Sequence, residues 1–148
     1  MTEVQFGDYS FRTEERENKK YIFDIARKKW IVLTPEEWVR QHVLHYLTGV
    51  LQYPVNHIAV ERAIMLNGLQ KRCDVVIFSK SSVPVMIVEC KAPEELLNEK
   101  VFEQIARYNL SLKVNYLWVT NGQRNFCCKL NKGIQLLQNV PTYAEINL

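Results

Sequence analysis

The sequence lacks several of the patterns that identify specialised classes of protein. Its five glycines do not form the GxxxxGK[ST] arrangement of a phosphate-binding loop, so we expect no ATP site in this chain. Its four cysteines show no CxxC spacing and no disulfide framework, and the stretch MTEVQFGDYS is too polar for a signal peptide. No apolar run approaches the ~20 residues that a membrane helix needs. These absences predict a soluble protein of the reducing cytoplasm with no membrane partner.

The sequence also lacks a large excess of charge of one sign, because its formal net charge is only +3. This charge permits a nucleic-acid partner without requiring one. The chain has 148 residues, of which 47% are hydrophobic and 24% charged, as in an ordinary globular protein with one core. We expect a polar segment that is flexible or loosely docked over residues 1–20, and a single domain over residues 21–148.

Short runs rich in β-branched and aromatic residues alternate with two amphipathic stretches. Thr34, Pro35 and Glu37 have the spacing of a helix N-terminus, with Thr34 as the N-cap and Glu37 completing a capping box. We expect strands over residues 21–25, 28–33, 58–64, 72–78, 85–91, 116–120, 125–130 and 134–138, and helices over residues 35–47 and 94–108. This order predicts an α/β fold with a central mixed β-sheet flanked by helices.

Three charged side chains are expected to meet at one end of an apolar hairpin. If Ser81 and Ser82 form a two-residue turn, the strand register places Asp74 directly opposite Glu89, with Cβ atoms ~5 Å apart. Side chains alternate along a strand, so Lys91 lies on the same face as Glu89 and Asp74. Two carboxylates and an amine therefore converge.

The paired carboxylates predict a divalent metal site. Two carboxylates so close repel each other unless a cation lies between them. Mg²⁺ or Mn²⁺ takes oxygen ligands, so we expect a site formed by Asp74, Glu89 and the backbone carbonyl of Cys90. Lys91 would orient or help to activate an attacking water and neutralise charge on a phosphoryl group. Such a site suits phosphodiester hydrolysis, whereas a solvated salt bridge at a strand end is the simpler alternative.

The phase of each helix directs further polar side chains toward this hairpin. In the first helix, Glu36 falls on the apolar stripe, while Glu37 points roughly 100° away. Glu36 is therefore expected as a further inward carboxylate, or else as a first-turn acid favoured by the helix dipole. In the second helix, Gln104 falls within the apolar stripe, so its amide needs polar partners. Tyr108, four residues later, reaches the same region or is an ordinary core residue.

A basic stretch near the start of the predicted domain offers a second feature. The residues RKKW (27–30), together with Lys19 and Lys20, are able to follow a phosphate backbone, although a solvated loop explains them equally well. Nothing in the sequence is suited to reading base edges, so no sequence specificity is predicted. His42 and His45 have no further ligand at a suitable spacing, which argues against zinc.

Asp74, followed after fourteen residues by Glu89-Cys90-Lys91, resembles the signature of the PD-(D/E)XK nuclease superfamily. The segments IARKKWIVLTPEEWVRQ, KRCDVVIF, VECKAP, FEQIARYN and WVTNG, in this order, resemble the nuclease domain at the N-terminus of type I restriction enzyme R subunits, in particular its small stand-alone members. The resemblance spans residues 22–130. This chain departs from the family pattern by having Cys73 in place of a proline and by lacking the motor's phosphate-binding loop.

The resemblance implies a restriction-endonuclease-like core and a metal-dependent DNA endonuclease in restriction, defence or DNA processing. It implies Asp74 and Glu89 as metal ligands, Lys91 as the catalytic lysine and a helix carboxylate best matched by Glu36. Gln104 would belong, with the tyrosine four residues later, to the family's Q-x-x-x-Y element. Separate specificity or motor subunits are the implied partners, and a homodimer would let two sites cut both strands. A non-catalytic nucleic-acid-binding or structural module, and a nuclease acting on RNA, remain as alternatives.

Overall fold

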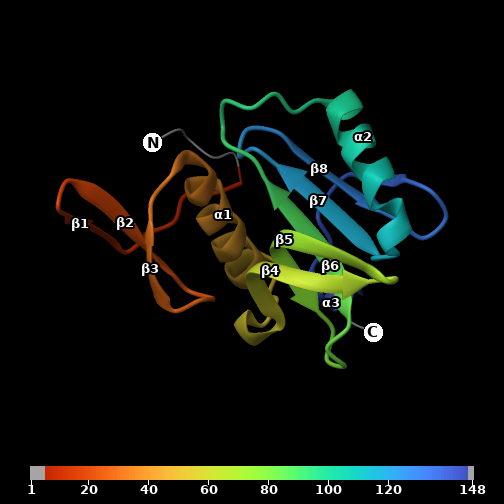
Figure 1. Cartoon of the computed structure of the whole chain (residues 1–148), viewed down its shortest axis with the longest axis horizontal. Coiled ribbons are helices and arrows are strands. Elements are labelled where there is room, and N and C mark those ends of the chain that lie inside the picture. Colours follow the sequence, from red (N-terminus) through yellow and green to blue (C-terminus); the bar gives the residue numbers. More distant parts are fainter. Residues whose placement is uncertain (1–5, 147–148) are drawn as a thin grey trace.

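The computed structural model describes residues 6–146, which form a three-stranded and a six-stranded sheet with helices between and around them (Figure 1). The smaller sheet contains β1 (Thr13–Arg16), β2 (Lys19–Asp24) and β3 (Lys29–Val32). The larger sheet contains β4 (Ile58–Leu66), β5 (Leu69–Phe78), β6 (Pro84–Cys90), β7 (Tyr116–Thr120), β8 (Asn125–Lys129) and β9 (Gln135–Leu137). The α-helices are α1 (Pro35–His45), α2 (Glu99–Asn109) and α3 (Tyr143–Ile146). Within residues 6–146, no helix is long and apolar enough to cross a membrane.

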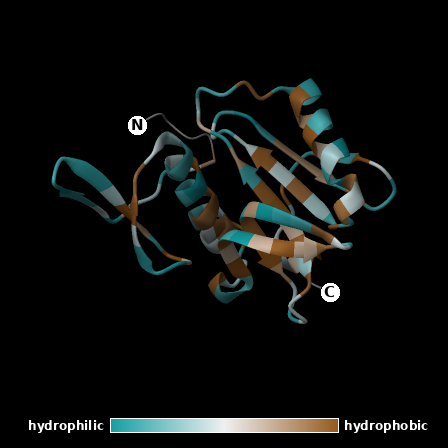
Figure 2. Ribbon diagram, viewed as in Figure 1, coloured by the Kyte–Doolittle hydropathy of each residue, from teal (hydrophilic) through white to brown (hydrophobic). Residues whose placement is uncertain are grey.

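The larger sheet is mixed. Its strands lie in the order β4-β5-β6-β7-β8-β9, and only β6 and β7 run parallel. Parallel neighbours need a crossover connection, which here contains α2. Along β5, Val75 packs in the core cluster that contains residues of α1, whereas Val76 packs in the cluster that contains residues of α2. Hydrophobic residues line the central strands in Figure 2. The expected α/β fold with a central mixed sheet flanked by helices is confirmed.

Helix α1 begins as the sequence predicts. Thr34 is the N-cap, and its Oγ1 accepts a hydrogen bond from the backbone N–H of Glu37 at 3.0 Å. After His45 the chain continues in a single π-helical turn, Tyr46–Val50. The helix lies between the two sheets (Figure 1). It consequently buries residues around most of its circumference: Glu37, Val39, Arg40, Gln41, His42, Val43 and Leu44.

The expected polar segment over residues 1–20 requires a correction. Residues 13–16 form β1, which pairs antiparallel with β2, so the boundary placed at residue 20 falls inside a strand. The four residues of β1, TEER, are all exposed, and a strand without an apolar face leaves no hydrophobic pattern to detect. The first five residues lie outside the described part of the chain.

Aromatic residues before β1 pack against α1. The ring of Phe11 lies 4.6 Å from that of His42 and 4.8 Å from that of His45, measured between centroids. Trp38 contacts His42 from within the helix, with ring centroids 4.5 Å apart. His42 is only 3% exposed, and its Nδ1 lies 2.8 Å from the carbonyl oxygen of Trp38. Both histidines therefore have a packing role.

On acidification the protein is expected to lose free energy of unfolding, and replacing His42 by Gln is expected to make this loss smaller. Burial is the main cause that lowers the pKa of His42 below its ordinary value. The unfolded chain then binds this proton more tightly than the folded chain, so native stability is full above about pH 6.5 and falls as the pH drops toward the folded pKa. Urea unfolding on either side of that pH measures the effect. An equal loss in wild type and His42→Gln would contradict the prediction.

Candidate active site

The β5–β6 hairpin has the register that the sequence predicts. Its paired positions are Val75 with Val88, Val76 with Ile87, and Ile77 with Met86. The pairing ends at Val75 and Val88, one residue short of Asp74 and Glu89. Asp74 lies against β6, because its Oδ2 accepts a hydrogen bond from the backbone N–H of Cys90 at 2.7 Å. The Asp74 carboxylate thus contacts the backbone of the Glu89-Cys90-Lys91 segment.

The turn of this hairpin differs from the two-residue turn expected at Ser81-Ser82. The backbone N–H of Ser79 donates to the carbonyl of Val83 at 2.8 Å, which leaves three residues in the turn. Ser82 has a φ of 61°, and the pairing shifts by one residue between Ile77 and Phe78. A three-residue turn with a left-handed residue and a bulge is a common hairpin connection. The bulge offsets the longer turn, so the register nearer Asp74 is unchanged.

Glu89 and Lys91 share one partly exposed face at the end of β6. Lys91 Nζ lies 3.3 Å from Glu89 Oε2 and 3.7 Å from Glu95 Oε2. The side chain of Cys90 points the other way, into the core, and burial raises the pKa of its thiol well above the usual value. Cys90 therefore contributes only backbone atoms to this face.

Arg40 is a buried cation at this site that the sequence analysis did not identify. It is 2% exposed, and its guanidinium donates to carboxylates from four residues. These are Glu37 Oε1 at 2.8 Å, Glu36 Oε1 at 2.9 Å, Glu61 Oε1 at 3.2 Å and Asp74 Oδ1 at 3.2 Å. The spacing EExxR, with carboxylates three and four residues before an arginine, could have indicated the two helical pairs. The pairs with β4 and β5 depend on the tertiary fold.

The expected roles of the first two acids of α1 need correction. Glu37 was predicted as an outward capping residue but is 5% exposed, and Arg27, Arg40 and Gln41 all donate to its carboxylate. The side chain of Glu36 was predicted to point inward but is 46% exposed. Glu36 nevertheless lies at the site, since the same nitrogen of Arg40 donates to Glu36 and Asp74. Burial and then the charge of Asp74 raise the pKa of Glu36 above its ordinary value.

Helix α2 begins later than expected and presents a different face to the core. Its N-cap is Asn98, whose Oδ1 accepts from the backbone N–H of Val101 at 2.8 Å, so residues 94–97 are not helical. The buried residues of the helix are Phe102, Ala106 and Asn109. Gln104 is therefore exposed rather than buried, and Tyr108 is 80% exposed. Both still border the site, because a surface hollow is lined by Lys71, Glu89, Gln104, Ile105, Tyr108 and Asn109.

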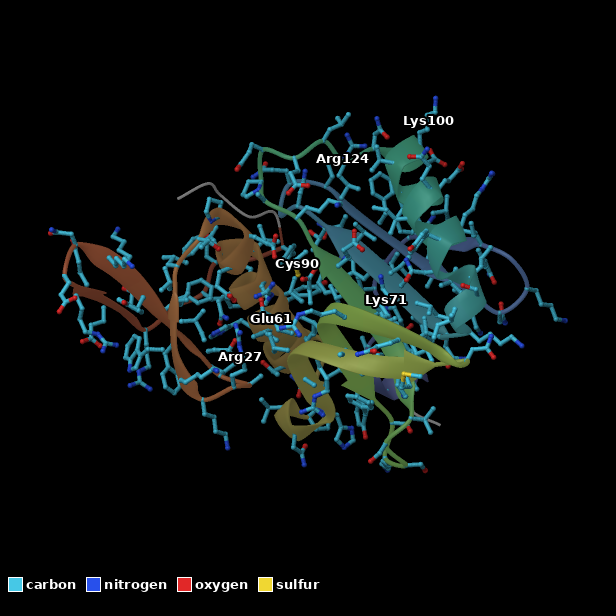
Figure 3. All side chains as sticks on the ribbon, in the orientation of Figure 1. Arg27, Glu61, Lys71, Cys90, Lys100 and Arg124 are labelled. Carbon is cyan, nitrogen blue, oxygen red and sulfur yellow. The ribbon has the colours of Figure 1, made fainter. Side chains whose placement is uncertain are left out.

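An ion-pair network joins the smaller sheet to the site. Arg27, in the β2–β3 turn, donates to Asp24 Oδ2 at 2.8 Å and to Glu37 Oε2 at 3.1 Å. Arg27 also lies 3.6 Å from Glu61, and Figure 3 shows the two residues beside α1. Burial by itself would raise the pKa of Asp24, but hydrogen bonds from Arg27 and Gln41 lower it overall. The network continues through Glu37 to Arg40.

The expected metal ligands can be tested by the chemistry of their atoms. Asp74, Glu89 and the carbonyl of Cys90 offer only oxygen donors, which is the set that Mg²⁺ and Mn²⁺ prefer. Across residues 6–146, no three His, Cys, Asp or Glu side chains are grouped so as to hold a metal by themselves. The oxygens of Asp74 are held by Arg40 and by the N–H of Cys90. The donor set thus fits a hard ion that keeps several water ligands.

Comparison with known proteins identifies the family of this chain. The family model described as type I restriction enzyme R protein N terminus (HSDR_N) matches residues 35–142. A solved fragment assigned as an HsdR subunit of a type I restriction enzyme from Vibrio vulnificus YJ016 has a TM-score of 0.55 and 23% identity. The match covers 77% of this chain but only 24% of that chain, and it shows a common fold. A comparison with curated proteins gives no match. Since the family model covers well over half of its residues, the chain belongs to the family of type I restriction enzyme R protein N-terminal domains.

Proposed function

We propose that this chain is a restriction-type endonuclease module of the PD-(D/E)XK class, which hydrolyses DNA phosphodiester bonds with the help of Mg²⁺ or Mn²⁺. One observation carries the proposal: the Asp74 carboxylate accepts a hydrogen bond from the backbone N–H of Cys90, and the side chains of the two neighbours of Cys90, Glu89 and Lys91, are paired with each other. Family membership supports it independently. In this proposal the chain uses no ATP, and any motor or specificity subunit is a separate partner.

Each residue of the site has a chemical task in this proposal. Asp74, Glu89 and the carbonyl of Cys90 would hold the ion, which when bound polarises a phosphoryl oxygen and lowers the pKa of a water ligand. Lys91 lies 3.3 Å from Glu89, so its ammonium group is held where it can orient water and offset phosphoryl charge. Gln104 borders the same hollow and is placed to position substrate or water. Glu36 is an additional carboxylate beside Asp74.

Arg40 favours one competing reading. Its guanidinium already compensates the charge of Asp74 and thereby reduces the need for a metal ion at that carboxylate. A nucleic-acid-binding module that keeps the fold without turnover would have this arrangement. A nuclease acting on RNA would share the same catalytic groups, so substrate tests need both nucleic acids.

Cleavage assays distinguish these readings. Purified protein is incubated with supercoiled plasmid, linear DNA and RNA, with and without Mg²⁺ or Mn²⁺, beside Lys91→Ala. We expect metal-dependent nicking of DNA that falls about a hundredfold or more in Lys91→Ala, because charge stabilisation at a reacting phosphate is lost. No cleavage under any condition, with nucleic-acid binding unchanged in the variant, would identify a binding module. Calorimetric titration of Mn²⁺ gives a second readout, in which equal affinity in wild type and Asp74→Ala would refute the metal site.

A further inference from the structure

The smaller sheet presents one outward face that the proposed chemistry does not use. Paired positions in the sheet are Glu14 with Tyr21, Arg16 with Lys19, Tyr21 with Val32, and Phe23 with Trp30. Alternate residues of a strand share a face, so these side chains lie together, joined by Arg12 beside Phe23. We call this set the wing face: Arg12, Glu14, Arg16, Lys19, Tyr21, Phe23, Trp30 and Val32. The opposite face contains Ile22 and Asp24, which are fully buried.

Arginines stack on aromatic rings across the wing face. The guanidinium carbon of Arg12 lies 4.3 Å from the ring centroid of Phe23 and 5.4 Å from that of Trp30. Arg16 lies 4.8 Å from the ring of Tyr21 and 6.0 Å from that of Trp30. Stacking holds a guanidinium by its flat surface and leaves its N–H groups directed along its edges. The rings therefore orient two exposed arginines.

The charge of the wing face is predominantly positive. Arg12, Arg16 and Lys19 are exposed, and the single acid among them is Glu14, which lies 3.2 Å from Arg16. Among the described residues, Arg12 has no carboxylate partner. Cation–π pairing alone would stabilise an exposed hairpin, but it accounts for only one surface of each guanidinium. Preoriented arginines with an excess of positive charge are suited to bind phosphate oxygens.

We propose that the wing face binds the phosphate backbone of duplex DNA beside the segment that enters the active site. The choice of DNA rests on the proposed function. The ion pairs of Arg27 with Asp24 and Glu37, and of Glu37 with Arg40, connect β2 to the site residue Asp74. The smaller sheet is thus connected to Asp74 by a continuous set of ion pairs, which holds the wing face in a fixed position relative to the proposed site.

Binding without cleavage tests this proposal separately from catalysis. Fluorescence anisotropy with a short labelled duplex, in EDTA and over a series of salt concentrations, compares wild type with the triple variant Arg12→Ala, Arg16→Ala and Lys19→Ala. We expect the affinity near 0.1 M salt to fall roughly tenfold or more, and the slope of log K against log salt to decrease by about 0.9 for each phosphate contact removed. Circular dichroism and thermal unfolding verify that the variant is folded.

Two further variants separate a local contact from a general change of charge. The triple variant Lys80→Ala, Lys100→Ala and Lys132→Ala removes the same charge from exposed positions elsewhere, and it should bind nearly as wild type does. Glu14→Gln removes the acid that competes for Arg16 and should raise the affinity several-fold.

The outcomes are distinguishable from failure of the proposed nuclease. If no condition gives cleavage but the wing variant still loses duplex binding and the control does not, the wing face binds DNA in a non-catalytic module. Equal affinity of the wing variant and wild type, an equal loss in the control variant, or no binding of duplex by wild type would each overturn the proposal. Unchanged DNA binding by the wing variant would instead favour a protein as the partner of the wing face.

Discussion

Replacing Glu89 by Gln is expected to lower metal-dependent DNA cleavage by about a hundredfold to a thousandfold while leaving the fold intact. The amide has nearly the same size but no negative charge, so it is a much poorer ligand for a hard divalent ion. Glu89 is the best position for this test, because its carboxylate contacts Lys91 and the side chain is partly exposed. Asp74 is less suitable, since its oxygens also hold Cys90 and Arg40. Plasmid nicking and Mn²⁺ titration measure the two effects.

Glu95→Gln is the matched control for this variant. Glu95 also lies near Lys91, with Oε2 at 3.7 Å from Nζ, but it is half-exposed and follows the strand rather than belonging to it. The substitution removes the same charge near the same lysine, and we expect cleavage to change less than about threefold. If Glu95→Gln and Glu89→Gln reduce cleavage equally, Glu89 acts through the charge of Lys91 and is not a metal ligand.

Replacing Arg40 by Met is expected to lower the free energy of unfolding by about 3–5 kcal/mol. Methionine approximates the length of the side chain but leaves buried Glu37 without one of its cations, and Asp74 without its side-chain donor. A loss of this size is a large fraction of the 5–15 kcal/mol that typically stabilises a domain. Urea unfolding monitored by tryptophan fluorescence measures it.

Arg72→Met provides the comparison. Arg72 also pairs with Glu61, at 3.7 Å, but its side chain is 68% exposed. Exposed ion pairs contribute little, so we expect a change within about 0.5 kcal/mol. Similar effects of the two substitutions would show that the carboxylates around Arg40 are adequately solvated and that the buried network is not a stabilising feature.

The hairpin of the site was predictable because its evidence is local. Strand alternation and the short polar turn predict the register of the hairpin and turn Cys90 toward the core, and the structure has both, with Asp74 hydrogen-bonded to the backbone of Cys90. An error in the turn type did not propagate, since a bulge at Ile77 and Phe78 restored the register. Buried apolar faces on both sides of a strand specify register strongly.

The helices were predicted less well, because an amphipathic pattern identifies the buried face only when the opposite face of the helix is exposed to solvent. Helix α1 lies between two sheets, so the polar residues Glu37, Arg40 and Gln41 are buried. Their sequence pattern is that of a solvent-exposed helix face. In α2 the true buried stripe includes Asn109, a polar residue whose Nδ2 donates to the carbonyl of Ile105. Polar residues inside a protein carry no hydrophobic signal, and their partners depend on tertiary structure.

The hydrogen bond from the buried hydroxyl of Tyr53 to the carbonyl of Pro141, at 2.7 Å, joins positions separated by 88 residues. The backbone N–H of Tyr143 likewise donates to the carbonyl of Leu51. During synthesis, the segment that follows α1 therefore waits for these partners until residues 141–143 have left the ribosome. Contacts of long sequence separation form late and slowly. The apolar surface around Tyr53 is uncovered until these residues emerge, so this region of a nascent chain is accessible to chaperones.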